Sequence, residues 1–225
     1  LKIHPKLKIF LNLIKLYNLI FKSKQISVQK NKFLSKSYAK ELNKKLKNQN
    51  YNLIFAPTAS AEIAYLKTNI PICFSSDTSF SQHFNYYNPT TKLSNSSYKV
   101  ADLLERKAIH NSKTVVYSSE WAANHVINYY DFSKENVCVV EYGANLDFIP
   151  KKFNLKKNCV GKNKILFLGV DWKRKRGDLV IESFKILRQK GFDIELIICG
   201  CVPLQKVYDS RIKVIPFLNK HNKKD

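Results

Sequence analysis

Methionine is absent from all 225 residues of the chain, including position 1. Since a natural reading frame begins with methionine, we expect the chain to be a fragment of a longer protein. Acidic residues are scarce as well: 17 Asp and Glu stand against 39 Lys and Arg, which gives a formal net charge of +22. A charge of this sign attracts phosphate groups, nucleic acid or an anionic membrane.

The excess charge also has a plain compositional explanation. The basic residues are mostly Lys, spread along the whole chain and accompanied by abundant Asn, Ile and Phe, a usage typical of an A/T-rich coding sequence. The sequence contains no RNA-binding module signature and no cluster of Arg interleaved with aromatic residues. Nucleic-acid binding is therefore disfavoured, although a basic protein that binds nucleic acid or an anionic surface stays open as an alternative.

No Cys-x-x-Cys pair occurs among the five cysteines, and their odd number does not suggest a disulfide framework. Zinc is therefore disfavoured. Buried, reduced thiols in a cytoplasmic protein are the simplest explanation. No apolar run approaches the length that is needed to cross a bilayer.

Residues 164–200 predict a strand, a loop, a helix and a second strand. The first strand is the apolar run 165–168, which Gly169 ends. We expect Asp178 to be the N-cap of the helix and Gly191 to stop it. The apolar run 194–199 is the second strand. Such a unit makes a parallel strand pair with a right-handed crossover.

The loop between the first strand and the helix holds four consecutive cations, residues 173–176. Ligands of parallel sheets bind beyond the carboxyl ends of the strands, and helix N-termini attract anions. We therefore predict an anion site for a diphosphate, with a solvated surface turn as the alternative. Gly200 follows the second strand, where a glycine lets the backbone approach a ligand closely.

The rest of the chain also alternates helices with strands. Helices are expected within 25–50 and at 62–67, 94–111 and 120–130, and strands at 51–56, 70–74, 114–117, 137–140 and 212–218. A polar, Lys-rich stretch at 153–163 is typical of a linker. The pattern predicts an α/β protein with two doubly wound domains.

Residues 1–22 are apolar except for a narrow stripe of Lys8, Asn12, Lys15, Asn18 and Lys22, which recur at three- and four-residue steps. This pattern has two interpretations. A helix packed on the core is favoured by the width of the apolar face. A basic amphipathic helix that lies on an anionic membrane is the alternative.

The segment GVDWKRKRGD, the helix after it and IELIICG resemble the donor domain of retaining glycosyltransferases of family four, where the pattern is roughly G-x-x-W-x-R-K-G-G-D. Lys175 matches the motif lysine and Arg174 the arginine before it, which implies contacts with the diphosphate of a nucleotide-sugar. Arg176 replaces a glycine, and Val170 stands where many members have arginine. The segment YSSEWAANHVINYY is similar to the acceptor domain of the same family.

This resemblance implies a GT-B-like α/β fold with two doubly wound, Rossmann-like domains, both incomplete in this chain, and a cleft between them. Residues 1–148 would be the acceptor-side domain, 149–163 the linker and 164–225 the donor-side domain. Donor binding is assigned to Gly169, Arg174, Lys175, Arg176 and Gly200.

The activity implied is that of a hexosyltransferase-type enzyme of glycan biosynthesis. It would move a sugar from a nucleotide-diphosphate donor to a glycan, lipid or small-molecule acceptor, with retention of configuration and with no cofactor or bound metal. A cytoplasmic protein in peripheral contact with an anionic membrane is consistent with these partners.

Two residues after the predicted strand 70–74 are candidates on the acceptor side. Asp77 is the candidate catalytic residue, because it would accept a hydrogen bond from a sugar hydroxyl or contact the leaving group at the functional edge of the sheet. Capping of a helix or turn explains this Asp equally well. His83 is a weaker candidate, because histidines in loops are usually just exposed.

Two features of the family are missing from the chain: the paired glutamates spaced E-x7-E and the glycine-rich loop near the N-terminus. A fragment without them is expected to bind the donor weakly and to turn over poorly. A truncated or decayed, non-catalytic relative therefore stays open as a further alternative.

Overall fold

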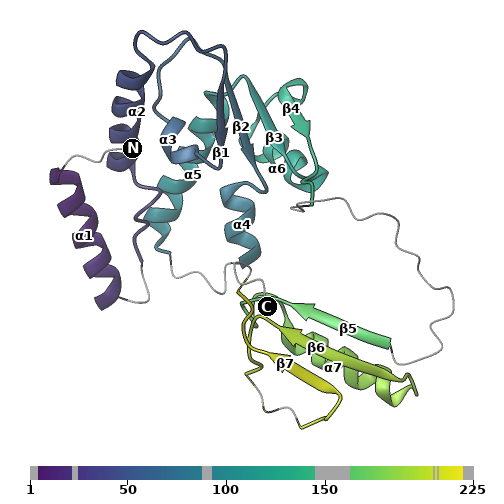
Figure 1. The fold of residues 1–225 in the computed structure, drawn as a ribbon. Coiled ribbons are helices and arrows are strands. Elements are labelled where there is room, and N and C mark those ends of the chain that lie inside the picture. The colour runs from purple at the N-terminus through teal and green to yellow at the C-terminus, as the bar shows by residue number, and fades with distance from the viewer. Residues whose placement is uncertain are drawn as a thin grey trace. The chain divides into compact units, whose positions relative to one another are not determined.

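The computed structural model describes residues 5–21, 25–87, 93–144, 163–204, 206 and 208–219. The chain divides into two compact units, unit 1 (Leu1–Asn145) and unit 2 (Leu146–Asp225), each of which is shown in Figure 1. The acceptor and donor roles of the two parts stay predictions. Of the predicted linker 149–163, only Asn163 is described. Asn163 is the first residue of a strand, so the predicted end of the linker is corrected at this residue.

Unit 1 holds α1 (Pro5–Ile20), α2 (Lys32–Leu46), β1 (Ile54–Pro57), α3 (Ser60–Ile63), β2 (Ile72–Ser76), α4 (Phe80–Tyr87), α5 (Asn95–His110), β3 (Thr114–Tyr117), α6 (Glu120–Tyr130), the 3-10 helix η2 (Lys134–Asn136) and β4 (Val137–Val139). Unit 2 holds β5 (Asn163–Leu168), α7 (Gly177–Gln189), β6 (Ile194–Cys199) and β7 (Ile212–Ile215).

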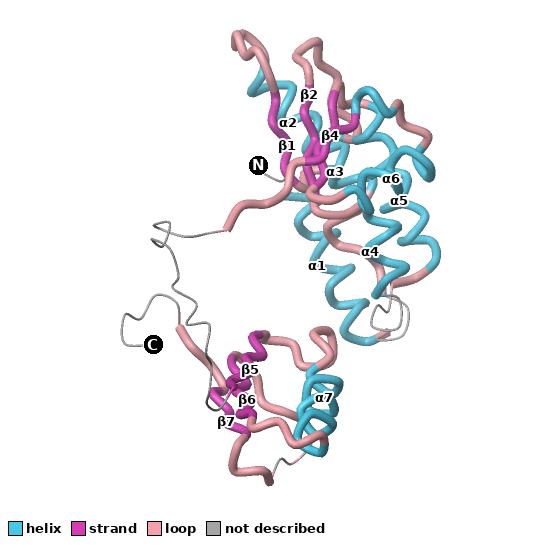
Figure 2. The backbone as a smooth tube through the Cα atoms, turned by 90° about the vertical axis from the view of Figure 1, so that its right-hand side faces the viewer, coloured by secondary structure: helices cyan, strands magenta, loops and turns pink. Residues whose placement is uncertain are grey.

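The strands of unit 1 form a parallel sheet in the order β1–β2–β3–β4. Each strand is added beside its predecessor in the same direction, so right-handed crossovers bring the connecting helices to the same face. α3, α5 and α6 supply buried residues to the core on that face, and Figures 1 and 2 show the helices beside the sheet. The α/β fold class that the sequence predicts is therefore confirmed.

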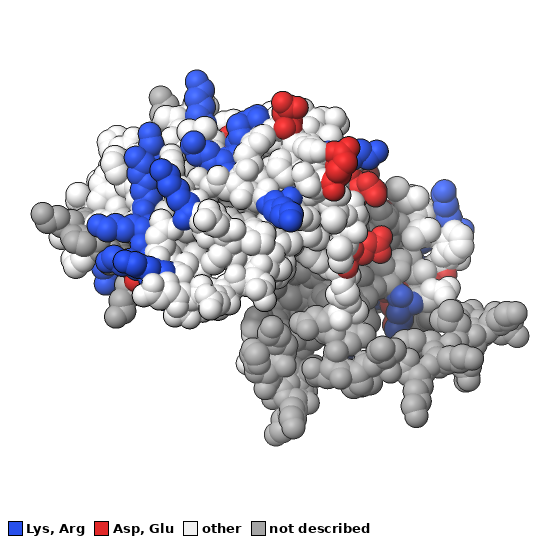
Figure 3. Space-filling model, turned by 90° about the horizontal axis from the view of Figure 1, so that it is seen from above, with Lys and Arg blue, Asp and Glu red and all other residues white. Residues whose placement is uncertain are grey.

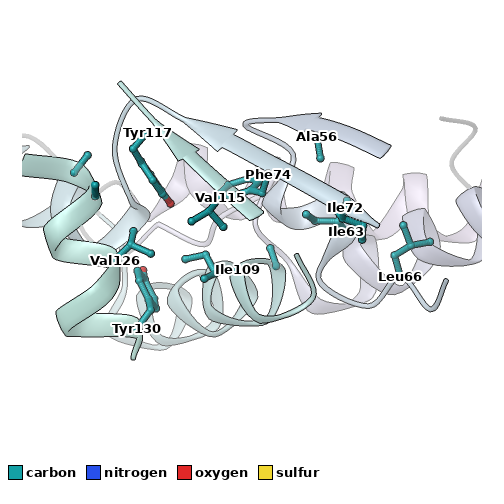
Figure 4. Close-up of a cluster of buried hydrophobic side chains, with 13 residues drawn as sticks. Ala56, Ile63, Leu66, Ile72, Phe74, Ile109, Val115, Tyr117, Val126 and Tyr130 are labelled. Atoms are coloured by element: carbon teal, nitrogen blue, oxygen red, sulfur yellow. The ribbon is translucent and has the colours of Figure 1, made fainter. Parts of the chain in front are cut away.

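The core of unit 1 lies between this sheet and its helices, as Figure 4 shows. Side chains alternate along a strand, so Ala56 is buried while its neighbour Phe55 is 63% exposed. Val115 and Tyr117 of β3 point toward α5 and α6. Val126 of α6 belongs to the same cluster. This packing fixes the strands and thus the edge of the sheet at which their carboxyl ends lie.

α1 contacts the rest of unit 1 through a narrow stripe. Leu11 and Ile14 are buried against Leu34 of α2, and the Asn18 amide exchanges hydrogen bonds of 2.7 and 2.8 Å with the backbone of Ile26. Most other apolar side chains of α1 are exposed. The interpretation of α1 as a helix packed on the core is therefore wrong for most of its apolar face, and it holds only for the stripe with Leu11 and Ile14. None of the described helices is long and apolar enough to span a membrane.

α4 follows β2 where we had expected a loop. Ser79 caps this helix, because its Oγ accepts a hydrogen bond from the backbone N–H of Gln82 (3.3 Å). Phe80 and Phe84, one turn apart, pack on Tyr98 of α5 with ring centroids 5.5 and 4.6 Å away. These contacts hold the helix at the end of β2.

The strands of unit 2 also form a parallel sheet, in the order β5–β6–β7. α7 covers one face of this sheet (Figure 2). Its core consists of Phe167, Trp172, Ile181, Phe184, Ile194, Leu196 and Ile198. The loop between β5 and α7 contributes Trp172 to this core, so the core reaches the end of the sheet where the anion site is predicted.

Candidate functional site

The loop between β5 and α7 is held in shape by its own hydrogen bonds. The N–H of Gly169 donates to the carbonyl of Cys199 (3.0 Å), which ties the end of β5 to the end of β6. The side chain of Asp171 accepts the N–H of Arg174 (3.0 Å), and its carbonyl accepts the N–H of Lys175 (3.0 Å). An Asp that bonds the backbone in this way is typical of a tight turn.

Trp172 anchors the loop in the core of unit 2. Its indole is 7% exposed and meets the Phe167 ring edge-on, with centroids 5.5 Å apart. Gly177 faces the indole so closely that an added Cβ would lie 2.3 Å from a ring carbon. Trp172 is the tryptophan of the segment GVDWKRKRGD, and an indole inside a run of charged residues is itself a signal of such an anchor.

Two glycines meet at the carboxyl ends of β5 and β6. Gly200 has a φ of +97°, and an added Cβ would stand 3.0 Å from the carbonyl oxygen of Gly169, so this position requires glycine for backbone reasons. Gly169 in turn faces Lys175, whose Cγ would lie 3.1 Å from a Cβ at Gly169. The contact of either glycine with a donor stays a prediction.

The four consecutive cations differ in their partners. Nη2 of Arg176 lies 3.2 Å from Oδ2 of Asp178, and Nε of Arg174 lies 3.9 Å from Oδ2 of Asp171. The two lysines of the run have no acidic partner among the described residues. All four cations are exposed. The charges of the lysines are therefore the ones that the loop itself leaves uncompensated.

Asp178 does not cap α7, and our prediction of this role was wrong. The helix begins at Gly177, so the N-cap is Arg176, whose backbone is left-handed (φ +56°) and whose side chain makes no capping bond. Gly177, which packs on Trp172, is already helical, so Asp178 lies inside the first turn. The carboxylate of Asp178 instead accepts hydrogen bonds from Arg176, which hold its pKa below the ordinary value. The left-handed backbone explains why glycine suits the position of Arg176.

A pocket of about 440 Å³ opens beside this loop. It is lined by Trp172, Lys173, Arg176, Asp178 and Leu204. Of the predicted donor-binding residues, the pocket includes Arg176 but not Arg174 or Lys175. The predicted set is thus divided, with Arg176 at the pocket and the stem of Lys175 against Gly169 at the end of β5.

In unit 1, Asp77 lies directly after β2 and is exposed. Ser118, which follows β3, donates a hydrogen bond to its carbonyl (3.4 Å), and Ser76 Oγ lies 3.5 Å from its carboxylate. No described cation pairs with this carboxylate. Because Ser79 caps α4, Asp77 does not have the helix-capping role that we considered as the alternative. Its carboxylate is positioned to accept hydrogen bonds, and its role with an acceptor stays a prediction.

His83 lies on the exposed side of α4, whereas His125 of α6 supports the same helix from within. Nδ1 of His125 is 2.9 Å from Oγ of the buried cap residue Ser79. Burial lowers the pKa of His125, and the nearby carboxylate of Asp102 opposes this effect. A neutral imidazole whose Nδ1 carries no proton accepts a hydrogen bond from the Ser79 hydroxyl. His83 was the histidine expected at the site from the sequence, and His125 was not, because no sequence signal separates His125 from an ordinary core histidine.

A second pocket, of about 650 Å³, lies at the carboxyl end of β1. Its polar lining includes Lys8, Asn12, Lys15, Tyr38, Thr58 and Glu62. Lys30 also lines this pocket. Its Nζ donates hydrogen bonds to Ser60 Oγ (3.0 Å) and to Glu105 Oε2 (2.7 Å). The volume suits a small molecule. Neither Asp77 nor His83 lines this pocket.

Within the described residues, no three His, Cys, Asp or Glu side chains gather in a way that could hold a metal ion. The described cysteines, Cys73, Cys138, Cys199 and Cys201, are free thiols. Burial raises the pKa of the thiols of Cys73 and Cys201, which favours their neutral form over a reactive thiolate.

Comparison with known families gives a match in unit 1. The family model described as Glycosyltransferase Family 4 matches residues 13–148, more than half of the 225 residues. No curated protein matches the chain significantly. The match covers β1 to β4, whereas the loop with the four cations lies outside it. The chain therefore belongs to glycosyltransferase family 4, and the chemistry of its family is glycosyl transfer.

Proposed function

We propose that this chain serves in the transfer of a sugar from a nucleotide-diphosphate donor to a glycan, lipid or small-molecule acceptor, with retention of configuration. In this proposal unit 2 binds the donor and unit 1 the acceptor. Positive side chains and the N-terminal amides of α7 stabilise the departing diphosphate, so that no bound metal is needed for this task.

The observation that carries the proposal is the setting of Lys175. Its stem lies against Gly169, at the end of β5 and directly before α7. The cations of this loop stand at the positive end of the helix dipole, an unfavourable arrangement that a bound anion relieves. Among the described residues no carboxylate neutralises Lys175. A diphosphate would therefore gain charge-assisted hydrogen bonds there without displacing an existing ion pair.

Asp77 supports the acceptor half of the proposal. It is an exposed carboxylate at the carboxyl end of β2, and the hydrogen bond from Ser118 holds its backbone near the end of β3. Polar ligands of parallel sheets bind at such ends. We infer that Asp77 accepts a hydrogen bond from an acceptor hydroxyl, with His83 of α4 on the same side of the reaction.

Titration calorimetry with UDP, GDP and ADP tests the donor assignment. Loss of one hydrogen bond to a charged group costs roughly 1.5–3 kcal/mol. Lys175→Ala should therefore weaken binding of the preferred nucleotide by about ten- to a hundredfold. Lys175→Arg, which keeps the charge, should restore part of the affinity.

Lys173→Ala is the matched control, since it removes the same charge from the same loop. We expect it to change the affinity much less than Lys175→Ala. Lys173 lines the pocket with Arg176, so the reverse ranking would mean that the diphosphate lies in that pocket and that Lys175 is wrongly assigned. Absence of binding by all three nucleotides would contradict the donor role of unit 2.

A further inference from the structure

The outward side of α1 is an uninterrupted apolar strip. Ile9, Leu13, Leu16 and Ile20 recur at steps of three and four residues, and their side chains are 54–65% exposed. They lie on the side of the helix opposite to Leu11 and its neighbours, which pack on α2. Large apolar residues that gather on one exposed face mark a surface with a partner.

The strip continues from α1 onto α2. Phe33 is 64% exposed and meets the ring of Phe10 edge-on, with centroids 5.7 Å apart. From Phe33 the same face of α2 continues with exposed Lys36, Lys40 and Lys44, at steps of three and four residues, and exposed Lys47 follows as the C-cap residue of the helix. We call the apolar strip, Phe33 and these four lysines the α1–α2 surface.

The lysines of this surface line one shallow groove of about 560 Å³, together with Ala39, Asn43, Tyr65 and Lys67. The Nζ of Lys36 lies over the Tyr65 ring, 5.6 Å from its centroid. Figure 3 shows Lys and Arg side chains gathered on one part of unit 1, with most of the visible acidic side chains away from them. The first acidic residue of the whole sequence is Glu41. The groove therefore fits anionic groups.

We propose that the α1–α2 surface docks on a bilayer that contains anionic lipids, with the apolar strip among the acyl chains and the lysines at the headgroups. The combination selects this partner. An apolar strip gains nothing from the phosphate backbone of a nucleic acid, and a second copy of the chain would bring its own lysines against these. Anionic lipid satisfies both halves of the surface at once. This inference is independent of the donor assignment and goes beyond it.

Vesicle co-sedimentation with the whole chain tests the proposal. Wild type should bind vesicles of equal parts phosphatidylglycerol and phosphatidylcholine and should bind pure phosphatidylcholine far more weakly. Each lysine near an anionic surface contributes about fivefold to binding. The triple variant Lys36→Gln/Lys40→Gln/Lys44→Gln should therefore lose about a hundredfold in affinity for the anionic vesicles.

The apolar half has its own test. Leu13→Gln/Leu16→Gln should weaken vesicle binding at least tenfold, and the loss should persist at high salt, where the lysine contribution is screened. Both side chains are exposed, so the melting temperature should stay near that of wild type. A control pair in unit 2, Val202→Gln/Leu204→Gln, removes similarly exposed apolar side chains and should leave vesicle binding unchanged.

A second control separates docking from general attraction. Lys164→Gln/Lys185→Gln/Lys213→Gln removes three exposed charges from unit 2. If it weakens binding as much as the α2 triple variant, net charge alone draws the chain to the membrane and the proposal is wrong. Equal binding to neutral vesicles would also overturn it. So would a wild-type dimer in sedimentation velocity that Leu13→Gln/Leu16→Gln dissociates, because a second copy would then cover the strip.

Discussion

Lys30 Nζ and Glu105 Oε2 lie 2.7 Å apart and join the segment before α2 to α5. The carboxylate of Glu105 is 3% exposed, whereas the lysine is 26% exposed. The same ammonium donates to Ser60 and stands 4.8 Å from the centroid of the Phe80 ring. One cation thereby connects the ends of β1 and β2 through the residues that follow them.

Lys30→Met should destabilise unit 1 by about 3–5 kcal/mol, because it leaves a buried carboxylate without its partner. The double variant Lys30→Met/Glu105→Leu should recover most of this loss, since neither charge then remains. Chemical denaturation of the two single variants and the double variant measures the coupling. A loss below about 1 kcal/mol for Lys30→Met would show that the pair behaves like an exposed one.

Tyr117→Phe should raise the stability of unit 1 by about 1 kcal/mol. The Tyr117 hydroxyl is buried and has no hydrogen-bond partner among the described residues, and such a group costs about 1–3 kcal/mol. Tyr130→Phe is the matched control, because that hydroxyl donates to Asp102 Oδ1 at 2.8 Å. It should lose about 1.5–3 kcal/mol. Denaturation midpoints of both variants check the opposite signs, and a loss for Tyr117→Phe would reveal a partner for its hydroxyl.

Gly177→Ala should destabilise unit 2 by about 1–3 kcal/mol, since the new methyl group would overlap the indole of Trp172. Trp172 is buried while Trp121 is 56% exposed, so Trp121→Phe makes the fluorescence of Trp172 visible alone. We expect its emission to shift toward that of a hydrated indole. Gly143→Ala is the control, because an added Cβ there meets nothing. Equal emission and stability for both variants would contradict the close packing.

His125 should make unit 1 less stable as the pH falls. Its pKa is lowered from 6.5 by burial, so the unfolded chain takes up a proton first. The stability contributed by neutral His125 is fully present above about pH 6.5 and is lost as the pH falls through the lower folded value. His125→Asn should flatten this part of the stability profile. His83→Asn, at an exposed histidine of α4, should keep the wild-type slope, and a slope that persists in His125→Asn would assign it to another group.

Asp77→Asn should lower the rate of sugar transfer by about ten- to a hundredfold, the value of one hydrogen bond to a charged group. The melting temperature should not change, because the carboxylate is exposed and caps no helix. Asp131→Asn, at an exposed left-handed residue where asparagine fits equally well, is the control for both measurements. An equally active but less stable Asp77→Asn protein would leave Asp77 only a structural role.

The fold class was predictable because the strands of a parallel sheet usually appear in the sequence as continuous apolar runs. Residues 165–168 and 194–199 show this pattern, and both lie within observed strands, β5 and β6. The prediction that the first run is buried holds only in part, because Leu166 and Leu168 of β5 are 63% and 69% exposed. The family could be recognised from two segments, GVDWKRKRGD in unit 2 and YSSEWAANHVINYY in unit 1. The second segment lies within the family match at residues 13–148, and the first lies outside it.

Other features depend on contacts that one segment does not encode. α1 itself carries apolar side chains on nearly every side. Only the position of α2 determines that Leu11 and Ile14 are the ones that become buried. His125 supports α4 because the fold brings it to Ser79, 46 residues away. α4 itself was predictable in part, since Ser79 and Gln82 have the spacing of a capping box.

Because Trp172 lies in the core of unit 2, the loop after β5, where we propose that an anion binds, is already ordered when the unit folds. Its conformational entropy is lost when the unit folds and is not lost again on binding. Ligand affinity is then linked to the integrity of the core. A substitution that loosens Phe167 from Trp172 would weaken anion binding without altering a single cation of the loop.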